Sequence, residues 1–330
     1  MPFSTDTPTP RENRIGLARV AIAGLIWGTI PLVLRAADGA SVIKVFYRVL
    51  FAAVALAIWL VATGRLSEVT TLSRRKLLQV AGQGVVLTVN WVLFLSALDL
   101  TNVATAELLG YTGPVFVAAL APFVTGERFD IRILLPLSLA LGGIVVILAP
   151  QGLAVASQSE LLGAGLAFAS ALTYATLLLR SKKILRGISG TALMVVEYTV
   201  ASALLLPFVV VLYSRGQGPT TVRSYMALAV LGLVQTAFAG VIFLGGLRRT
   251  RTDHAAILTY AEPVAAVLFA AAFLGEALTA WTAIGGAMVV AGGLAVARLT
   301  PSAEPAPPLE AAGIESDSEI DDSDSAARER

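Results

Sequence analysis

The sequence contains no cysteine and only one histidine, His254. The chain can therefore form no disulfide bond and no thiol site, and it lacks the histidines that nucleophile–base pairs and metal clusters need. The H-E-x-x-H and phosphate-loop motifs of metalloproteases and nucleotide-binding enzymes are also missing. These absences argue against an enzyme and against a bound metal or cofactor.

Charged residues are scarce as well. They make up 14% of the chain, where a soluble domain carries about 25%. Hydrophobic residues make up 56%, and the mean hydropathy is +0.79. The apolar residues form repeated runs of about 20, the length that crosses a bilayer, and they do not alternate as barrel strands do. The predicted fold class is therefore an all-α integral membrane protein.

We expect ten transmembrane helices joined by short linkers. Their approximate ranges are 15–35, 42–62, 77–98, 103–124, 132–149, 161–180, 190–213, 224–247, 254–274 and 279–298. Residues 1–14 are expected to form a polar N-terminal tail. Residues 301–330 hold nine acidic residues against two arginines, in a composition that cannot bury a core and so predicts disorder.

The positive charges indicate how the helices are oriented. With the N terminus inside, the inner segments hold seventeen Lys and Arg residues, and the outer segments hold four. Basic residues in short loops mark the cytoplasmic side of a membrane protein. Both termini are therefore expected in the cytoplasm.

One stretch of the sequence occurs twice. Four landmarks return 149 residues later: Tyr111, Pro114, Gly126 and Glu127 as Tyr260, Pro263, Gly275 and Glu276. Each copy then continues to a glycine pair, Gly142–Gly143 or Gly292–Gly293. A long internal repeat divides the chain into two similar halves, here 15–150 and 160–300.

Each half contains five of the expected helices. Because five is odd, the second half must lie inverted in the membrane. Inverted repeats are a transporter architecture in which the substrate site lies near the membrane midplane, between the repeats.

The repeat landmarks, with Trp27–Gly28, Arg48 and Glu262, resemble the drug/metabolite transporter superfamily, and within it the ten-helix EamA type. The resemblance covers about 15–300. It implies two EamA repeats and transport of small metabolites, since bacterial amino-acid and metabolite exporters belong to this type. It also implies a place in the bacterial inner membrane, but it does not specify a substrate.

Ionisable residues inside apolar helices are costly and are therefore functional candidates. Four residues qualify: Arg48, Glu107, Glu197 and Glu262. From the helical rise, Arg48 and Glu107 lie roughly 9 and 6 Å below the outer ends of their helices, so the two could meet. Glu197 and Glu262 lie roughly 10 and 12 Å above the inner ends.

Glu262 is the strongest candidate because it precedes Pro263. The proline removes the hydrogen bond to the Thr259 carbonyl, so a carboxylate, a freed carbonyl and Tyr260 lie together. Such a carboxylate would bind a proton as the coupling ion, or a substrate ammonium. In the alternative, structural interpretation the carboxylate pairs with a cation or hydroxyl and fixes the kink. The first repeat has Gly113 at this position.

Arg48 and Glu197 occupy the same position in the two repeats, 149 residues apart. Arg48 would bind a substrate carboxylate with two hydrogen bonds, or it would pair with Glu107 and lock the second helix to the fourth. Glu197 is a further candidate. Its depth places it in the opposite half of the membrane from Arg48, so we expect no direct pair.

A small-molecule site is mostly apolar and aromatic, with a few placed polar groups. The helices supply such residues: Trp27, Gln83, Asn90, Trp91, Tyr111, Tyr174, Gln235 and Tyr260. We expect them to line a cavity between helices 1, 3, 4, 6, 8 and 9. The alternative for each polar residue is a hydrogen bond that joins two helices.

The remaining landmarks are predicted to be structural. Pro114 and Pro263 kink helices, and Gly126–Glu127 and Gly275–Glu276 form turns and caps at helix ends. The glycine pairs Gly142–Gly143 and Gly292–Gly293 provide small-residue faces, through which helices 5 and 10 pack against each other or against a second copy of the chain. His254 lies beside Arg248, Arg249 and Arg251 and is expected to face lipid headgroups.

The predicted function is secondary transport of small polar or amphipathic metabolites, with export of amino acids or related compounds by alternating access. A sugar or nucleobase permease of the same fold is the alternative within the class. A non-transporting membrane scaffold or sensor, whose acidic tail binds a partner, is the alternative outside it. The expected partners are the lipid bilayer, a small-molecule substrate, a proton and, for a homodimer, a second copy; nothing predicts nucleic-acid binding.

Overall fold

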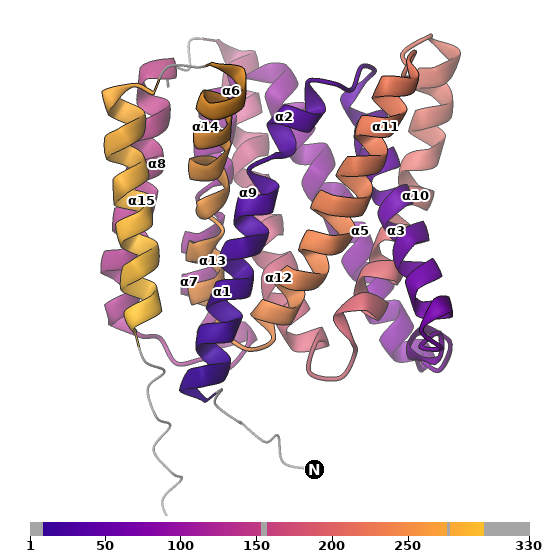
Figure 1. The fold of residues 1–330 in the computed structure, drawn as a ribbon, viewed down its shortest axis with the longest axis horizontal. Helices are drawn as coiled ribbons and strands as arrows, with labels where there is room; N and C mark the ends of the chain where they lie inside the picture. The colour runs from indigo at the N-terminus through magenta and orange to yellow at the C-terminus, as the bar shows by residue number, and fades with distance from the viewer. Residues whose placement is uncertain (1–8, 153–156, 276–277, 300–330) are drawn as a thin grey trace, which may run out of the picture. The chain divides into compact units, whose positions relative to one another are not determined.

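The computed structural model describes residues 9–152, 157–275 and 278–299 of the 330-residue chain. Glu276 and the acidic tail lie outside the described residues. Within those ranges the chain is helical, and no strand occurs (Figure 1). The prediction of an all-α fold is thereby confirmed.

Ten helical spans are long and apolar enough to cross a membrane within the described ranges, as predicted. Spans 1 to 5 are Pro10–Leu34 (α1 Pro10–Trp27, α2 Ile30–Leu34), Ser41–Ala62 (α3), Arg74–Leu100 (α5), Val103–Val124 (α6 Val103–Gly110, α7 Gly113–Val124) and Ile131–Leu148 (η1 Ile131–Ile133, α8 Leu134–Leu148). Spans 6 to 10 are Gln158–Ile184 (α9), Gly190–Ser214 (α10), Val222–Leu247 (α11 Val222–Val230, η3 Leu231–Phe238, α12 Ala239–Leu247), Thr252–Leu274 (α13 Thr252–Leu258, α14 Ala261–Leu274) and Ala280–Arg298 (α15). Two short helices lie between spans: α4 (Ser67–Thr70) and η2 (Ala149–Gln151).

The first helix begins at Pro10, earlier than the expected boundary near residue 15. The cause is local. Thr9 and Glu12 form a reciprocal capping box, and a proline stands at the first helical position, where its missing N–H costs nothing. Residues 10–14 therefore extend span 1 instead of belonging to a tail.

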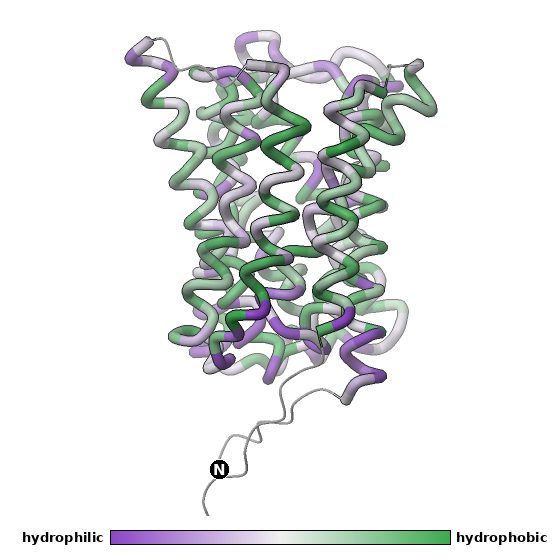
Figure 2. Tube along the Cα trace, turned by 90° about the vertical axis from the view of Figure 1, so that its left-hand side faces the viewer, coloured by the Kyte–Doolittle hydropathy of each residue, from purple (hydrophilic) through white to green (hydrophobic). Residues whose placement is uncertain are grey.

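Apolar side chains cover the outward faces of the spans. Phe123, Leu135 and Phe273 are 85%, 71% and 71% exposed, which water would penalise and hydrocarbon does not. Figure 2 shows hydrophilic residues gathered mostly at the two ends of the spans, with apolar residues between them. This distribution is typical of a multi-pass membrane protein.

The packing of the helices reproduces the sequence repeat. Span 3 packs against span 6 (α5 with α9), and span 8 packs against span 1 (α12 with α1), so each pair is the repeat image of the other. Span 2 packs against its own image, span 7, and span 5 against its image, span 10. The α8–α15 and α3–α10 pairs are visible at opposite sides of Figure 1. The fold is thus two inverted five-helix repeats.

Tyr111 and Tyr260, which are repeat partners, meet in the interior. The Tyr260 hydroxyl donates a hydrogen bond to the Tyr111 carbonyl oxygen at 2.5 Å, and the two ring centroids lie 6.0 Å apart. Spans 4 and 9 both break at these tyrosines, before α7 and before α14. The axis that relates the two repeats therefore passes close to this pair.

The glycine pairs allow span 5 to approach span 10 closely. A methyl group on Gly143 would lie 2.5 Å from the carbonyl oxygen of Gly285, and one on Gly292 would lie 2.8 Å from that of Pro136. The two contacts are repeat images of each other. Of the two packing partners expected for these glycine faces, the structure places span 10 against span 5.

Candidate functional site

A cavity of about 300 Å³ lies between the two repeats. Its lining comes from spans 1, 2, 3, 6, 7, 8 and 9. Compared with the expectation, spans 2 and 7 contribute and span 4 does not. Span 4 is kept out because Tyr174 of α9 packs against it: a methyl group on Gly113 would lie 2.6 Å from the Tyr174 ring.

Three of the four ionisable candidates line this cavity: Arg48 on α3, Glu197 on α10 and Glu262 on α14. The fourth, Glu107, is partly buried on α6 outside the lining. Glu197 is only 7% exposed. The carboxylates of Glu197 and Glu262 form neither a hydrogen bond nor an ion pair in the described part of the chain. Both acids are therefore available to a bound solute.

Arg48 is held by two contacts. Its Nε donates a 2.6 Å hydrogen bond to Thr236 Oγ1, and its guanidinium carbon lies 5.5 Å from the centre of the Trp91 ring. The expected alternative, an ion pair with Glu107, is not formed. Thr236 and Trp91 instead hold the guanidinium at the cavity. Its remaining N–H groups can bind an anion there.

Thr236 belongs to an unusual stretch of span 8. Residues Leu231–Phe238 (η3) form a π-helix, a rare backbone form that is frequent at functional sites. The backbone carbonyl oxygen of Gln235, in this stretch, accepts a hydrogen bond from the Trp27 indole N–H at 2.8 Å. The side-chain amide of Gln235 donates a hydrogen bond to Thr29 Oγ1 at 3.0 Å. Its side-chain oxygen Oε1 is buried and has no hydrogen-bond partner among the described residues. Gln235 lines the cavity, but this oxygen has almost no accessible surface, so a solute donor reaches it only after the side chain moves.

Asn90 and Tyr174 also line the cavity, and both already join helices. The Asn90 amide donates to the Ser170 carbonyl at 2.7 Å and to Thr173 Oγ1 at 2.9 Å. The Tyr174 hydroxyl lies 3.3 Å from Thr259 Oγ1. Asn90 and Tyr174 therefore line the cavity and also join two helices by hydrogen bonds, as the alternative interpretation expected.

Two small residues of span 1 bring Glu262 to the cavity. A methyl group on Gly28 would lie 2.5 Å from the side chain of Ala265, and one on Gly24 would lie 3.2 Å from that of Ala261. Helix α14 can therefore lie directly against α1, with Glu262 between these contacts. The Thr259 carbonyl, expected to be freed by Pro263, instead accepts the Glu262 backbone N–H at 3.0 Å, because the chain turns more tightly at this break.

Three other predicted residues lie outside the lining. Tyr111 and Tyr260 bind each other, and Tyr260 is fully buried. Gln83 is also fully buried and donates to the Leu177 carbonyl and to Ser181 Oγ, at 2.8 and 2.9 Å. Each of them joins two spans.

The structure also adds lining residues that the sequence prediction missed: Tyr198, Thr236, Met194 and Phe243. Tyr198 and Thr236 directly follow predicted residues, so a wider window around Glu197 and Gln235 would have found them. Phe243 lies 5.1 Å from Trp27, centre to centre, one turn or more beyond the π-helix. The apolar residues carry no signal that separates them from the rest of the core.

A polar network ties spans 4, 6, 8 and 9 together at the end that carries the basic loops. The Glu127 carboxylate accepts the Thr252 N–H at 2.9 Å and its hydroxyl at 2.7 Å, which caps α13. Burial raises the pKa of Glu127, and the charge of Lys182 opposes that rise. Lys182 in turn donates to the carbonyl oxygens of Leu247, at 2.7 Å, and Thr250.

His254 lies inside this network and does not face lipid headgroups, so that prediction was wrong. The side chain is 1% exposed, and its Nε2 lies 4.0 Å from Asp253 Oδ1. Asp253 itself pairs with Arg251 at 2.6 Å. The neighbouring arginines suggested a membrane surface, but capping by Glu127 draws the start of α13 inward and buries the imidazole.

The contact between Thr236 and Arg48 can be tested separately from the charge itself. A hydrogen bond to a charged group contributes about 1.5–3 kcal/mol, so Thr236→Val is expected to raise the KM for transport about tenfold, with a smaller change in kcat. Thr236→Ser keeps the hydroxyl and should restore the wild-type KM. If the valine and serine variants transport alike, Thr236 does not position Arg48.

The lining combines one guanidinium, two free carboxylates and two amide residues with aromatic and apolar walls. A mostly apolar and aromatic lining with a few placed polar groups is typical of a site that binds a small molecule. Ionisable groups of both signs around a cavity inside inverted repeats define a membrane transporter.

Comparison with known proteins gives the particular family. The model of the EamA-like transporter family matches residues 14–149 and 161–298, so the chain belongs to that family. An uncharacterized transporter of Archaeoglobus fulgidus is 31% identical over 284 residues, 86% of this chain and 96% of the relative. A second uncharacterized transporter of that organism is 28% identical over 249 residues, 75% of this chain and 84% of the relative. These relatives are named transporters, not enzymes.

A solved crystal structure shares the fold. It superposes with a TM-score of 0.75 and 22% sequence identity, and the match covers 86% of this chain and 99% of the other.

Proposed function

We propose that the protein is a secondary transporter that exports amino acids or related small polar or amphipathic metabolites across the bacterial inner membrane. The observation that carries the proposal is the cavity in which Arg48 lies with the unpaired carboxylates of Glu197 and Glu262. A zwitterion fits this lining, because Arg48 would bind its carboxylate and one of the acids would bind its ammonium. The other acid is then free to bind a proton as the coupling ion.

The mechanism we propose is alternating access between the two inverted repeats. Equivalent halves of opposite orientation can exchange conformations, which opens the cavity to each side in turn. The network of Glu127, Lys182 and Thr252 supports this mechanism, because it joins spans 4, 6, 8 and 9 by side chains that can release one another. In the cytoplasm-facing state this network would open.

The proposed orientation has both termini in the cytoplasm. It follows from the excess of basic residues in the loops at one end. We expect tags placed at each terminus to be accessible to antibody only after the cell membrane is permeabilised. A tag that is accessible on intact cells would contradict the orientation, and one terminus on each side would contradict the even number of spans.

The function is tested by comparing the metabolites that cells release when they express the full chain, the chain without residues 301–330, or an empty vector. We expect one compound or a small group to accumulate outside only with the two proteins. Uptake of that compound into proteoliposomes would confirm direct transport. A compound that disappears on deletion of the tail would favour a scaffold or sensor, and absence of transport in either direction would contradict the proposal.

A further inference from the structure

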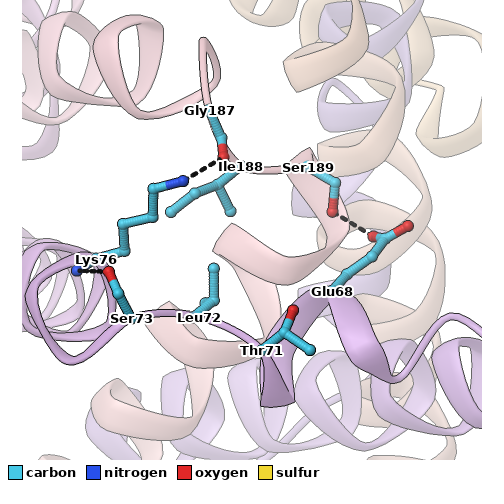
Figure 3. Close-up of a pocket in the computed structure, with 8 residues that line it drawn as sticks. All are labelled: Glu68, Thr71, Leu72, Ser73, Lys76, Gly187, Ile188 and Ser189. Carbon is cyan, nitrogen blue, oxygen red and sulfur yellow. Dashed lines mark hydrogen bonds between the residues drawn. The ribbon is translucent and has the colours of Figure 1, made fainter.

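A second cavity, of about 340 Å³, lies at the end of the protein that carries the basic loops. Figure 3 shows it between the segment that leads into α5, on one side, and the connection from α9 to α10, on the other. The lining residues that matter most here are Glu68, Ser73, Lys76, Gly187 and Ser189. Nothing in the transport function requires this cavity.

The acid and the base in this cavity differ in their partners. Glu68 binds Arg65 Nε at 2.6 Å and the Ser189 hydroxyl at 2.5 Å, and these two bonds hold its pKa below the ordinary value. Its charge is therefore compensated by Arg65. Lys76 donates only to the Gly187 carbonyl, at 3.2 Å, and forms no ion pair in the described part of the chain. The cavity thus contains an ammonium group without a counter-ion.

The repeat supplies a direct comparison at the opposite end of the protein. There, Asp38 stands two residues before Ala40, the N-cap of α3. Its carboxylate accepts the Thr220 N–H at 3.2 Å and the Ser224 hydroxyl. These hydrogen bonds, that of Ser224 first, lower the pKa of Asp38, so the site holds a fixed negative charge.

The corresponding positions in the second cavity are Gly187 and Lys76. Gly187 stands two residues before Ser189, the N-cap of α10, as Asp38 stands before the N-cap of α3. Lys76 stands three residues after Ser73, the N-cap of α5, as Ser224 stands three after the N-cap of α11. One end of the protein has a carboxylate and its donor, whereas the other has a lysine, a glycine and an empty volume.

We propose that this cavity binds the phosphate group of an anionic phospholipid in the adjacent leaflet, with Lys76 as its counter-ion. The phosphate takes the place that the Asp38 carboxylate occupies in the other repeat. A lipid is the source because the spans at this end of the protein expose large apolar side chains. Trp59 and Val61 of α3 and Leu78 of α5 are 56%, 61% and 62% exposed, and acyl chains would lie along them.

The proposal is tested on the purified full-length chain in detergent, by thermal stability with added phosphatidylglycerol or phosphatidylcholine. We expect phosphatidylglycerol to raise the Tm of the wild type. Lys76→Gln should weaken the apparent affinity about tenfold, as expected for the loss of one charged hydrogen bond. Arg74→Gln, which removes an exposed charge two residues earlier and outside the lining, should respond as the wild type does.

A second pair of variants does not depend on losing a charge. Gly187→Asp places a carboxylate where Asp38 stands in the other repeat, and a side chain fits because its Cβ would meet only Lys76 Nζ, at 3.6 Å. This variant should have a raised Tm without lipid and no further response to phosphatidylglycerol. Gly187→Ala should keep the wild-type response.

Three results would overturn the proposal. One is an equal loss in Lys76→Gln and Arg74→Gln, which would mean unspecific attraction to anionic lipid. Another is a rise in Tm with phosphatidylglycerol as large as that of the wild type in Lys76→Gln or in Gly187→Asp. The third is an equal Tm shift from inorganic phosphate alone, because the ligand would then be a soluble anion and not a lipid.

Discussion

Glu262→Gln is expected to abolish net transport or to uncouple it from the proton gradient, while the protein still folds and inserts. The substitution keeps the shape of the side chain and removes its charge and its ability to exchange a proton. Loss of one charged contact to the substrate alone would cost about 1.5–3 kcal/mol, which is roughly ten- to a hundredfold in affinity. The pH dependence of the rate should also flatten, because the variant has no proton to exchange at this position.

Glu107→Gln is the matched control for this prediction. Glu107 is also a carboxylate inside a span, but it lies outside the cavity lining. Its substitution should leave the transport rate close to that of the wild type and should keep a pH dependence, because Glu262 can still exchange a proton. Both variants are measured as uptake into proteoliposomes across a range of pH, with the amount of folded protein fixed by size-exclusion chromatography. Wild-type rates and pH dependence in Glu262→Gln would remove Glu262 from the mechanism.

Gly143→Ala is expected to destabilise the protein, whereas Gly142→Ala, one residue earlier, should have little effect. A methyl group on Gly143 meets the Gly285 carbonyl oxygen at 2.5 Å, which is backbone and cannot move alone. A methyl group on Gly142 meets only the flexible end of Met288, at 3.2 Å. Overpacking of this kind costs about 1–3 kcal/mol, or a fall in Tm of roughly 1–4 °C for a chain of this size.

The repeat makes the same prediction a second time. Gly292→Ala should destabilise, since its methyl group meets the Pro136 carbonyl oxygen at 2.8 Å, and Gly293→Ala should be mild, since the nearest atom is a Leu258 methyl at 3.3 Å. Thermal unfolding of the four variants measures both pairs. If all four have the same Tm, spans 5 and 10 do not depend on this close approach.

The repeat in the sequence predicted the fold because its landmarks have backbone roles. Gly126 and Gly275 have φ of +75° and +69°, which only glycine adopts without strain. The two turns after spans 4 and 9 can therefore be recognised in the sequence by their glycines. Tyr111 and Tyr260 likewise mark the two helix breaks. Hydrophobic runs of sufficient length supplied the rest of the ten spans.

The site was predicted less completely, for two physical reasons. Depth along a helix follows from counting residues, but the direction of a side chain around the helix depends on packing, so Arg48 and Glu107 matched in depth and yet do not meet. The sequence of Leu231–Phe238 does not predict the π-helix in span 8, because a π-helix differs from an α-helix in its backbone hydrogen bonds and not in its residue types. That stretch decides where Gln235 and Thr236 point.

If the cavity between the repeats opens to the two sides of the membrane in turn, single cysteines placed towards each side should differ in their labelling. The chain has no native cysteine, so Ile30→Cys and Ser181→Cys, made one at a time, each introduce one thiol. Both residues line the cavity, and they lie in α2 and near the end of α9, towards opposite membrane surfaces. The measurement is the labelling rate of each variant with a membrane-impermeant thiol reagent, in the presence and absence of the transported compound. Alternating access should make the compound change the two rates in opposite directions; rates that change together, or not at all, would show that the cavity does not alternate.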